Sequence, residues 1–239
     1  MKTRCGTLYG IGVGPGDPDL ITVKALRILK SVSAIFAASS TKNGYSLAET
    51  IVKKHLGYTP VERMPFPMTR DKELLAKHWE ANAGRVLEVL NEGDDAAFVT
   101  LGDPSTYSTF TYLVRSVRRI APHVPVVTVP GITSYHAAAA LSNTPLTEGE
   151  ESFHLISGAN GGRNLRKIIE SSENVVVLKT YKYFDDIFDT LEDLDLVDRS
   201  ILVSRMGLED ETVVEDLRSL KGKTLPYLSL VIIKKRNRT

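Results

Sequence analysis

The sequence contains a single cysteine, Cys5, and no long hydrophobic run. One cysteine excludes a disulfide within the chain. No apolar stretch approaches the roughly 18–20 residues that span a bilayer. The N-terminus also lacks the apolar segment that follows the positive start of a secretory signal. We therefore expect a cytoplasmic protein with no membrane partner.

An excess of charge of either sign is also missing. Thirty Lys and Arg residues stand against 29 Asp and Glu, which gives a net charge of +1 over 239 residues. This balance argues against a polyanion-binding protein, so no nucleic-acid partner is expected, although a local basic patch for an acidic small molecule remains possible. The one basic cluster, 234–238, is terminal and predicts a solvated tail.

Several common catalytic and binding motifs are absent. The loop 10–20 is rich in glycine, but a G-x-G-x-x-G pattern that starts at Gly10 or Gly12 would need glycine where Pro15 or Asp17 stands. No G-x-S-x-G elbow is present for a serine nucleophile. The five histidines are scattered without a chelating i, i+4 pair. The sequence therefore predicts neither a dinucleotide fold nor a metal site.

The hydrophobic pattern alternates between strands and helices through the first part of the chain. Short apolar runs predict strands, longer segments with helical spacing predict helices, and two prolines in 61–68 indicate an extended connection. This alternation is typical of an α/β unit with a mostly parallel sheet, in which ligands gather at loops beyond the carboxyl ends of strands. The expected strands are 7–13, 34–38, 95–100 and 124–129, and the expected helices are 20–29, 46–56, 71–90, a stretch to about 120, and 136–141.

Three loops rich in glycine and proline, 10–20, 101–107 and 130–134, follow expected strands. A linker-like composition at 143–149 then predicts two α/β domains, 1–143 and 144–239. Fewer helices than strands in the second domain indicate a mixed sheet. Its expected strands are 152–157, 174–180, 201–205, 212–215 and 227–234, with helices near 164–171 and 185–194.

These three loops, in the segments 12–25, 102–108 and 129–134, resemble the signature loops of the tetrapyrrole methylases. This family comprises class III S-adenosylmethionine-dependent methyltransferases of corrin and sirohaem synthesis. The resemblance extends through 145–147, 177–179 and 226–229. Within the family, the segment 205–207 and the Pro-Tyr-x-Ser ending are most similar to the branch that methylates C-20 of precorrin-2 or cobalt-factor II.

The resemblance implies S-adenosylmethionine as cofactor, S-adenosylhomocysteine as product and a homodimer. It also implies a cofactor cleft between the two domains, with the tetrapyrrole on the N-terminal side. Asp103 and Tyr107 are the expected catalytic residues, and Tyr135 is a further candidate base. The cofactor-binding residues carried over by position are Pro15, Leu101, Gly102, Asp103, Thr106, Thr133, Ser134, Leu178, Met206, Gly207 and Leu228.

The substrate expected from this resemblance is a polycarboxylate, for which a mouth lined with basic side chains is suited. The same fold could instead methylate another ring position, uroporphyrinogen III or a diphthamide precursor, and a non-catalytic tetrapyrrole binder is a further alternative. Whether the ring carries cobalt stays open. The basic candidates are Lys42, Arg70, Lys72, Arg163, Lys179, Lys182 and Arg205.

Overall fold

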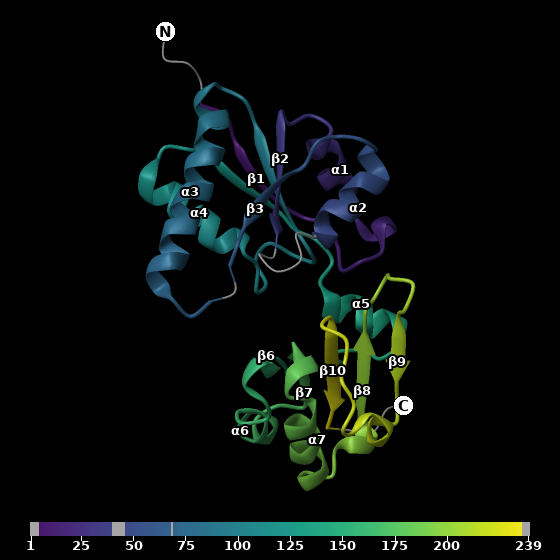
Figure 1. The fold of residues 1–239 in the computed structure, drawn as a ribbon. Coiled ribbons are helices and arrows are strands. Elements are labelled where there is room, and N and C mark those ends of the chain that lie inside the picture. The colour runs from purple at the N-terminus through teal and green to yellow at the C-terminus, as the bar shows by residue number, and fades with distance from the viewer. Residues whose placement is uncertain (1–4, 40–45, 68, 236–239) are drawn as a thin grey trace. The chain divides into compact units, whose positions relative to one another are not determined.

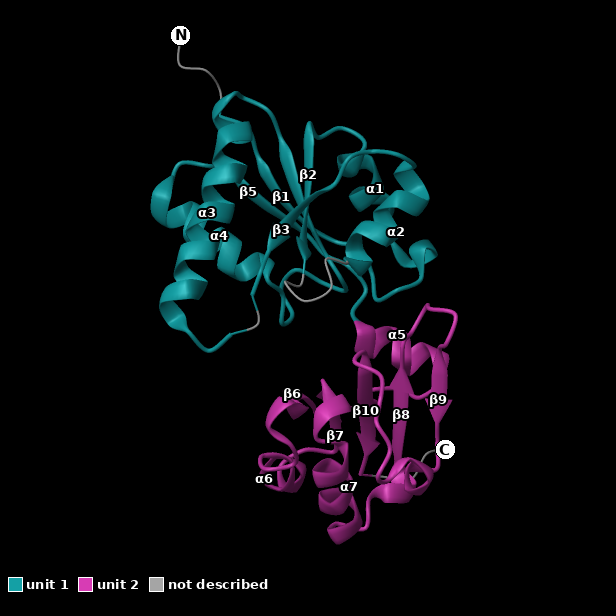
Figure 2. Cartoon of the chain, viewed as in Figure 1, with its two compact units in different colours: residues 1–133 teal, residues 134–239 magenta. Residues whose placement is uncertain are grey.

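The computed structural model describes residues 5–39, 46–67 and 69–235 (Figure 1). The chain divides into two compact units, 1–133 and 134–239 (Figure 2). This division lies ten residues before the boundary expected at 143. The reason is that the helix α5 (Ser134–Leu141) packs through Ala138 on the sheet of the second unit. Among the described residues, no helix combines the length and the apolar character that a membrane span requires.

The first unit is built on a five-stranded sheet in which every strand pairing is parallel, as the sequence predicts. The strand order is β3-β2-β4-β1-β5. The first strand in the chain therefore lies between the fourth and the fifth. Its strands are β1 (Leu8–Gly12), β2 (Ala34–Ser39), β3 (Glu62–Pro65), β4 (Ala96–Thr100) and β5 (Val126–Val129).

Helices cover both faces of this sheet (Figure 1). The helices α1 (Val23–Leu29) and α2 (Leu47–Leu56) pack on one face, and α3 (Lys72–Asn91) and α4 (Phe110–Ile120) pack on the other. Asp71 caps α3, because its carboxylate accepts from two backbone N–H groups of the first turn at 3.0 and 3.1 Å. Both faces of the sheet are thus buried, and the loops at its edges remain for binding.

One element of the first unit differs from expectation. The proline-containing segment 61–68 was expected to be an extended connection, but Glu62–Pro65 forms the edge strand β3 and pairs with β2 in parallel. Pro65 is tolerated there because an edge strand leaves one side of its backbone unpaired. Met68 lies outside the described residues.

The second unit contains the expected mixed sheet, with the order β6-β7-β10-β8-β9. The β6–β7 pairing is parallel, and the other three pairings are antiparallel. The helix α5 packs on one face, and α6 (Leu165–Glu170) and α7 (Phe184–Asp193) pack on the other. The strands are β6 (Phe153–Ser157), β7 (Asn174–Leu178), β8 (Ser200–Ser204), β9 (Thr212–Val214) and β10 (Ser229–Lys234). Short 3-10 helices occupy Pro18–Leu20, Gly158–Asn160, Thr180–Lys182, Val197–Arg199 and Leu217–Leu220.

A buried carboxylate joins α2 to the edge strand β3. The Glu49 side chain is 5 % exposed and accepts from Arg63 Nε at 2.5 Å and from Arg63 Nη2 at 3.2 Å. Lys53 Nζ lies 2.6 Å from Oε1 of Glu49, the oxygen that also accepts from Arg63 Nη2. The hydrogen bonds from Arg63, more than the neighbouring Lys53, lower the pKa of Glu49 below its ordinary value.

This lowered pKa predicts acid-sensitive stability. The carboxylate of Glu49 stabilises the fold fully above its unfolded pKa, about 4.3, and loses this effect as the pH falls through the lower folded pKa. Urea unfolding of the wild type and Glu49→Gln should therefore show a gap in stability at pH 7 that narrows toward pH 3. Glu62→Gln, which removes an exposed ion pair with Arg85, is the control and should show a smaller loss. A gap that stays constant with pH would contradict the assignment.

Candidate functional site

The three glycine-rich loops converge at the end of the first sheet where the carboxyl ends of its strands lie, which we call an edge of the sheet from here on. The strands β4, β1 and β5 are neighbours and run in parallel. The loops that follow them therefore leave the same edge, beyond the carboxyl ends of the strands. Ligands of open parallel sheets bind at such an edge.

Backbone atoms of the three loops touch at their glycines. A Cβ built on Gly12 would lie 2.5 Å from the carbonyl oxygen of Gly102 and 2.6 Å from the amide nitrogen of Gly131. A Cβ built on Gly131 would lie 2.2 Å from the same carbonyl oxygen. Since real Cβ atoms do not approach backbone this closely, only glycine fits at these two positions.

Hydrogen bonds also tie the first loop to the second. The amide of Gly102 donates to the carbonyl of Gly14 at 2.6 Å, and the amide of Gly14 donates back at 3.3 Å. Both glycines have a positive φ, +87° for Gly14 and +69° for Gly102, which other residues rarely adopt. The glycine spacing read from the sequence therefore serves close packing between loops.

Asp103 ties the second loop to the third. One carboxylate oxygen, Oδ1, accepts from the amide of Ser105 at 2.8 Å within its own loop. The other, Oδ2, accepts from the amide of Gly131 at 3.0 Å. Both oxygens thus accept hydrogen bonds from backbone amides, which is a role that the sequence did not suggest for Asp103.

The predicted site residues of the first unit lie in these loops. Pro15 is buried, Thr133 is 8 % exposed, and the hydroxyl of Thr100 at the base of the second loop hydrogen-bonds Ser108 at 3.0 Å. Tyr107 is 54 % exposed. The loops bring together Pro15, Leu101, Gly102, Asp103, Thr106, Tyr107 and Thr133 at one sheet edge.

A second group of predicted residues gathers in the second unit. Leu178 ends β7, and its register partner is Leu230 near the start of β10. The amide of Arg205 donates to the carbonyl of Leu228 at 2.8 Å. Leu178, Met206, Gly207 and Leu228 thus lie at one edge of the second sheet, and Ser134 begins α5, which packs on that sheet.

A tyrosine pair lies beside this second group. The rings of Tyr181 and Tyr227 are 4.9 Å apart between centroids. Desolvation, with a smaller contribution from Tyr181, raises the pKa of Tyr227 above its ordinary value. As in an ordinary tyrosine, the phenol is protonated at neutral pH and can donate a hydrogen bond.

Comparison with known proteins identifies the family of the chain that carries these loops. Residues 7–221 match the family model described as tetrapyrrole (corrin/porphyrin) methylases. The chain belongs to this family. It is 38 % identical to a protein of Methanocaldococcus jannaschii named "probable cobalt-precorrin-2 C(20)-methyltransferase", over 98 % of this chain and 99 % of that protein. It is 32 % identical to the cobalt-precorrin-2 C(20)-methyltransferase of Salmonella typhimurium, over 96 % and 97 %.

A solved structure of the same family supports the fold. The uroporphyrin-III C-methyltransferase of Thermus thermophilus, complexed with S-adenosylhomocysteine, superposes with a TM-score of 0.66. It is 25 % identical and covers 95 % of this chain and 97 % of its own. The two α/β units expected from the sequence are therefore confirmed as a tetrapyrrole methylase fold.

The basic residues expected for this tetrapyrrole methylase that the structure describes follow the carboxyl ends of strands. Arg70 and Lys72 follow β3 in the first unit and are exposed. In the second unit, Arg205 pairs with Asp210, and Lys182 lies 5.2 Å from the ring centroid of Tyr183. Lys42 lies outside the described residues. The remaining two, which are exposed and follow β6 and β7, are Arg163 and Lys179.

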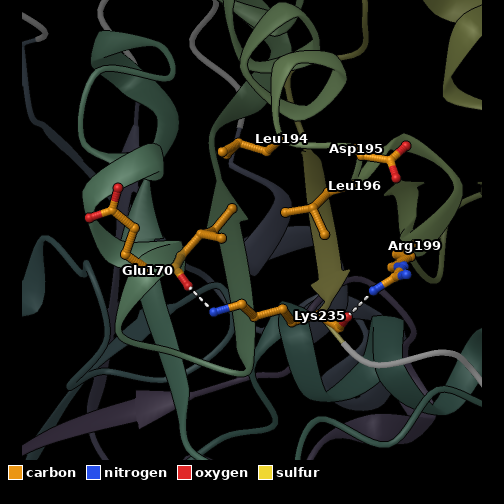
Figure 3. A pocket seen from close by; sticks show the side chains of 7 residues that line it. Glu170, Leu194, Asp195, Leu196, Arg199 and Lys235 are labelled. Atoms are coloured by element: carbon orange, nitrogen blue, oxygen red, sulfur yellow. Dashed lines mark hydrogen bonds between the residues drawn. The ribbon is translucent and has the colours of Figure 1, made fainter.

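A separate pocket lies at the other edge of the second sheet (Figure 3). Lys235 follows the carboxyl end of β10, which is antiparallel to β7 and β8, and its Nζ donates to the carbonyl of Ile169 at 3.0 Å. Arg199 donates to the carbonyl of Lys235. None of the predicted site residues lines this pocket. The lining residues are Ile169, Glu170, Leu194, Asp195, Leu196, Arg199 and Lys235.

Sequence reasoning missed the backbone conformation of three residues at these edges. Tyr107, Lys179 and Arg205 have φ values of 50°, 60° and 54°. Left-handed backbone is uncommon for residues with large side chains. Because no residue type signals it here, the sequence offered no way to find these positions.

Proposed function

We propose that this tetrapyrrole methylase transfers a methyl group from S-adenosylmethionine to the C-20 meso carbon of precorrin-2, or of its cobalt form, in cobalamin biosynthesis. The observation that carries the proposal is similarity along the full chain to proteins named for this reaction, at 38 % and 32 % identity. The convergence of the glycine loops at one sheet edge supports it.

The chemistry of the loops suits the cofactor. S-adenosylmethionine carries a flat adenine, an ammonium and a sulfonium, for which apolar walls, backbone donors and carbonyl acceptors are appropriate. The first-unit loops offer the apolar Pro15 and a backbone that glycine brings close together at one place. We propose these loops as cofactor contacts. The second-unit contacts, Ser134, Leu178, Met206, Gly207 and Leu228, stay a prediction from family resemblance.

The main requirement of the reaction is that the ring carbon is aligned with the methyl group. When bound, the cofactor supplies a methyl group that its sulfonium already activates. The protein has to hold the ring carbon in line with that methyl group, and such positioning can supply several kcal/mol, up to about 7–11 in ideal intramolecular cases. Loop position predicts Asp103 and Tyr107 as acceptors of the meso proton, and Asp103 in addition holds the two loops in register.

Incubation with labelled S-adenosylmethionine and precorrin-2, with and without inserted cobalt, tests the function. We expect label in the tetrapyrrole with at least one form, located at C-20 by NMR. Transfer to neither form, with S-adenosylhomocysteine still bound, would contradict the proposal. That outcome would favour uroporphyrinogen III, another ring position or a diphthamide precursor as acceptor.

Substrate affinity should also depend on salt if basic side chains bind the carboxylates of the ring. Raising the salt concentration from 0.05 to 0.5 M shortens the screening length, so we expect the Kd for precorrin-2 to rise by about an order of magnitude. A Kd that does not change with salt concentration would contradict binding by a mouth of basic side chains.

A cytoplasmic location and a homodimer stay predictions, the first from composition and the second from family resemblance.

A further inference from the structure

Tyr107 combines strained backbone with an exposed ring in the second glycine loop. Its φ is 50°, and its side chain is 54 % exposed. A bulky residue with positive φ carries a conformational cost that persists only where the surrounding structure imposes it. Residues held in such conformations cluster at active sites and ligand-binding loops. The conformation of Tyr107 and its place in the second glycine loop therefore point to a function of the side chain.

The residues on both sides of Tyr107 impose its conformation. The amide of Thr106 donates to the carbonyl of Asp103 at 3.3 Å. On the other side, the hydroxyl of Ser108 is buried, lies 3.0 Å from the hydroxyl of Thr100, and accepts from the amide of Phe110 at 3.1 Å. The loop is thus anchored before and after the tyrosine, and the ring projects from a fixed backbone.

The place of this ring narrows what it can contact. The loop of Tyr107 leaves the same sheet edge as the loops of Gly12 and Gly131, which we propose as the cofactor edge. A partly exposed aromatic ring on a fixed backbone suits a flat conjugated ligand, because ring faces pack well and little side-chain entropy is lost. Two flat groups belong to the proposed reaction, the tetrapyrrole and the adenine.

We propose that Tyr107 is a substrate-contacting residue whose ring packs against the tetrapyrrole and sets its position, and that the phenol does not accept the meso proton. The inference rests on the proposed function, since it takes the tetrapyrrole as the ligand. A ring that positions the substrate acts through its face, so its hydroxyl is dispensable for binding. A tetrapyrrole offers a larger flat conjugated face to the tyrosine ring than adenine does, which favours the tetrapyrrole as the ligand.

Three variants test this role. Tyr107→Gly removes the ring and relieves the strain, Tyr107→Ala removes the ring and keeps the strain, and Tyr107→Phe keeps the ring without the hydroxyl. Thermal unfolding, calorimetric titration with S-adenosylhomocysteine and anaerobic spectroscopic titration with precorrin-2 are measured for each. Tyr58→Ala, at a fully exposed tyrosine between α2 and β3, is the matched control.

We expect Tyr107→Gly to unfold at a temperature no lower than the wild type and to bind S-adenosylhomocysteine within twofold of it. Its affinity for precorrin-2 should fall at least tenfold, with Tyr107→Ala close to it and Tyr107→Phe restoring affinity to within threefold of the wild type. Unchanged precorrin-2 affinity in both Tyr107→Gly and Tyr107→Ala would overturn the proposal. An equal or greater loss of S-adenosylhomocysteine affinity would assign the ring to the adenine instead.

The outcomes separate this inference from the proposed function. If the wild type binds precorrin-2 without methylating it, the C-20 function fails, while the affinity comparison still decides the role of Tyr107. If the wild type binds uroporphyrinogen III instead, the same titrations are made with that ring. If Tyr107→Phe binds precorrin-2 like the wild type but its kcat falls more than a hundredfold, the phenol is the base and the inference is wrong.

Discussion

Replacing Gly131 by alanine is expected to reduce the affinity for S-adenosylhomocysteine at least about tenfold and to destabilise the first unit. The new Cβ would lie 2.2 Å from the carbonyl oxygen of Gly102 and 2.7 Å from the carbonyl carbon of Gly12. These neighbours are backbone atoms and cannot rotate away, so the loops must separate. Forcing one carbon into such packing costs about 1–3 kcal/mol and sometimes more.

The measurement pairs thermal unfolding with calorimetric titration of S-adenosylhomocysteine. Gly84→Ala is the control, because a Cβ at Gly84 in α3 would meet nothing within 4 Å. In a helix interior that change should stabilise by about 0.5–1 kcal/mol and leave ligand affinity unchanged. Wild-type affinity in Gly131→Ala would show that the close approach of the loops is not needed for binding.

Asp103→Asn is expected to weaken cofactor binding by about 1–3 kcal/mol, which corresponds to roughly 5–150-fold in affinity. Asparagine offers one acceptor where aspartate offers two. If its carbonyl faces the amide of Ser105, its NH₂ faces the amide of Gly131, and two donors then meet. The tie between the second and third loops is lost.

A matched control for this variant is available at the start of α3. The carboxylate of Asp71 also accepts from two backbone amides, but both belong to its own helix. Asparagine caps helices about as well as aspartate, so Asp71→Asn should leave stability and affinity near wild type. Unchanged cofactor affinity and unchanged turnover in Asp103→Asn would contradict a role for the loop tie.

Much of the fold could be predicted because its strands and helices carry strong local patterns. The segment 71–90 predicts a helix, and α3 spans Lys72–Asn91 with Asp71 as its cap. The segment 61–68 was predicted to be an extended connection, because its two prolines hid a short edge strand whose pairing depends on β2. The domain boundary differs for a similar reason, because the packing of α5 on the second sheet leaves no mark in composition.

The candidate site was predictable at the level of loops and not of contacts. Glycine spacing and family resemblance identified the loops around Gly12, Gly102 and Gly131, and the structure places them at one edge. The roles of individual side chains depend on tertiary geometry. That Asp103 bonds the amide of Gly131, and that Tyr107 adopts a positive φ, follows from contacts between segments distant in sequence.

The strand order of the first sheet has a consequence for how the chain folds as it is made. The first strand, β1, pairs only with β4 and β5, whose residues come about 90 and 120 positions later, as in Leu8 with Ala96 and Val126. At about 5–20 residues per second, β1 waits on the order of 10 s for its second neighbour. During that time its backbone has no second strand to pair with, and its apolar side chains are not yet fully buried. A nascent chain truncated before β5 should therefore depend on chaperones, and the glycine loops can meet only after that strand has emerged.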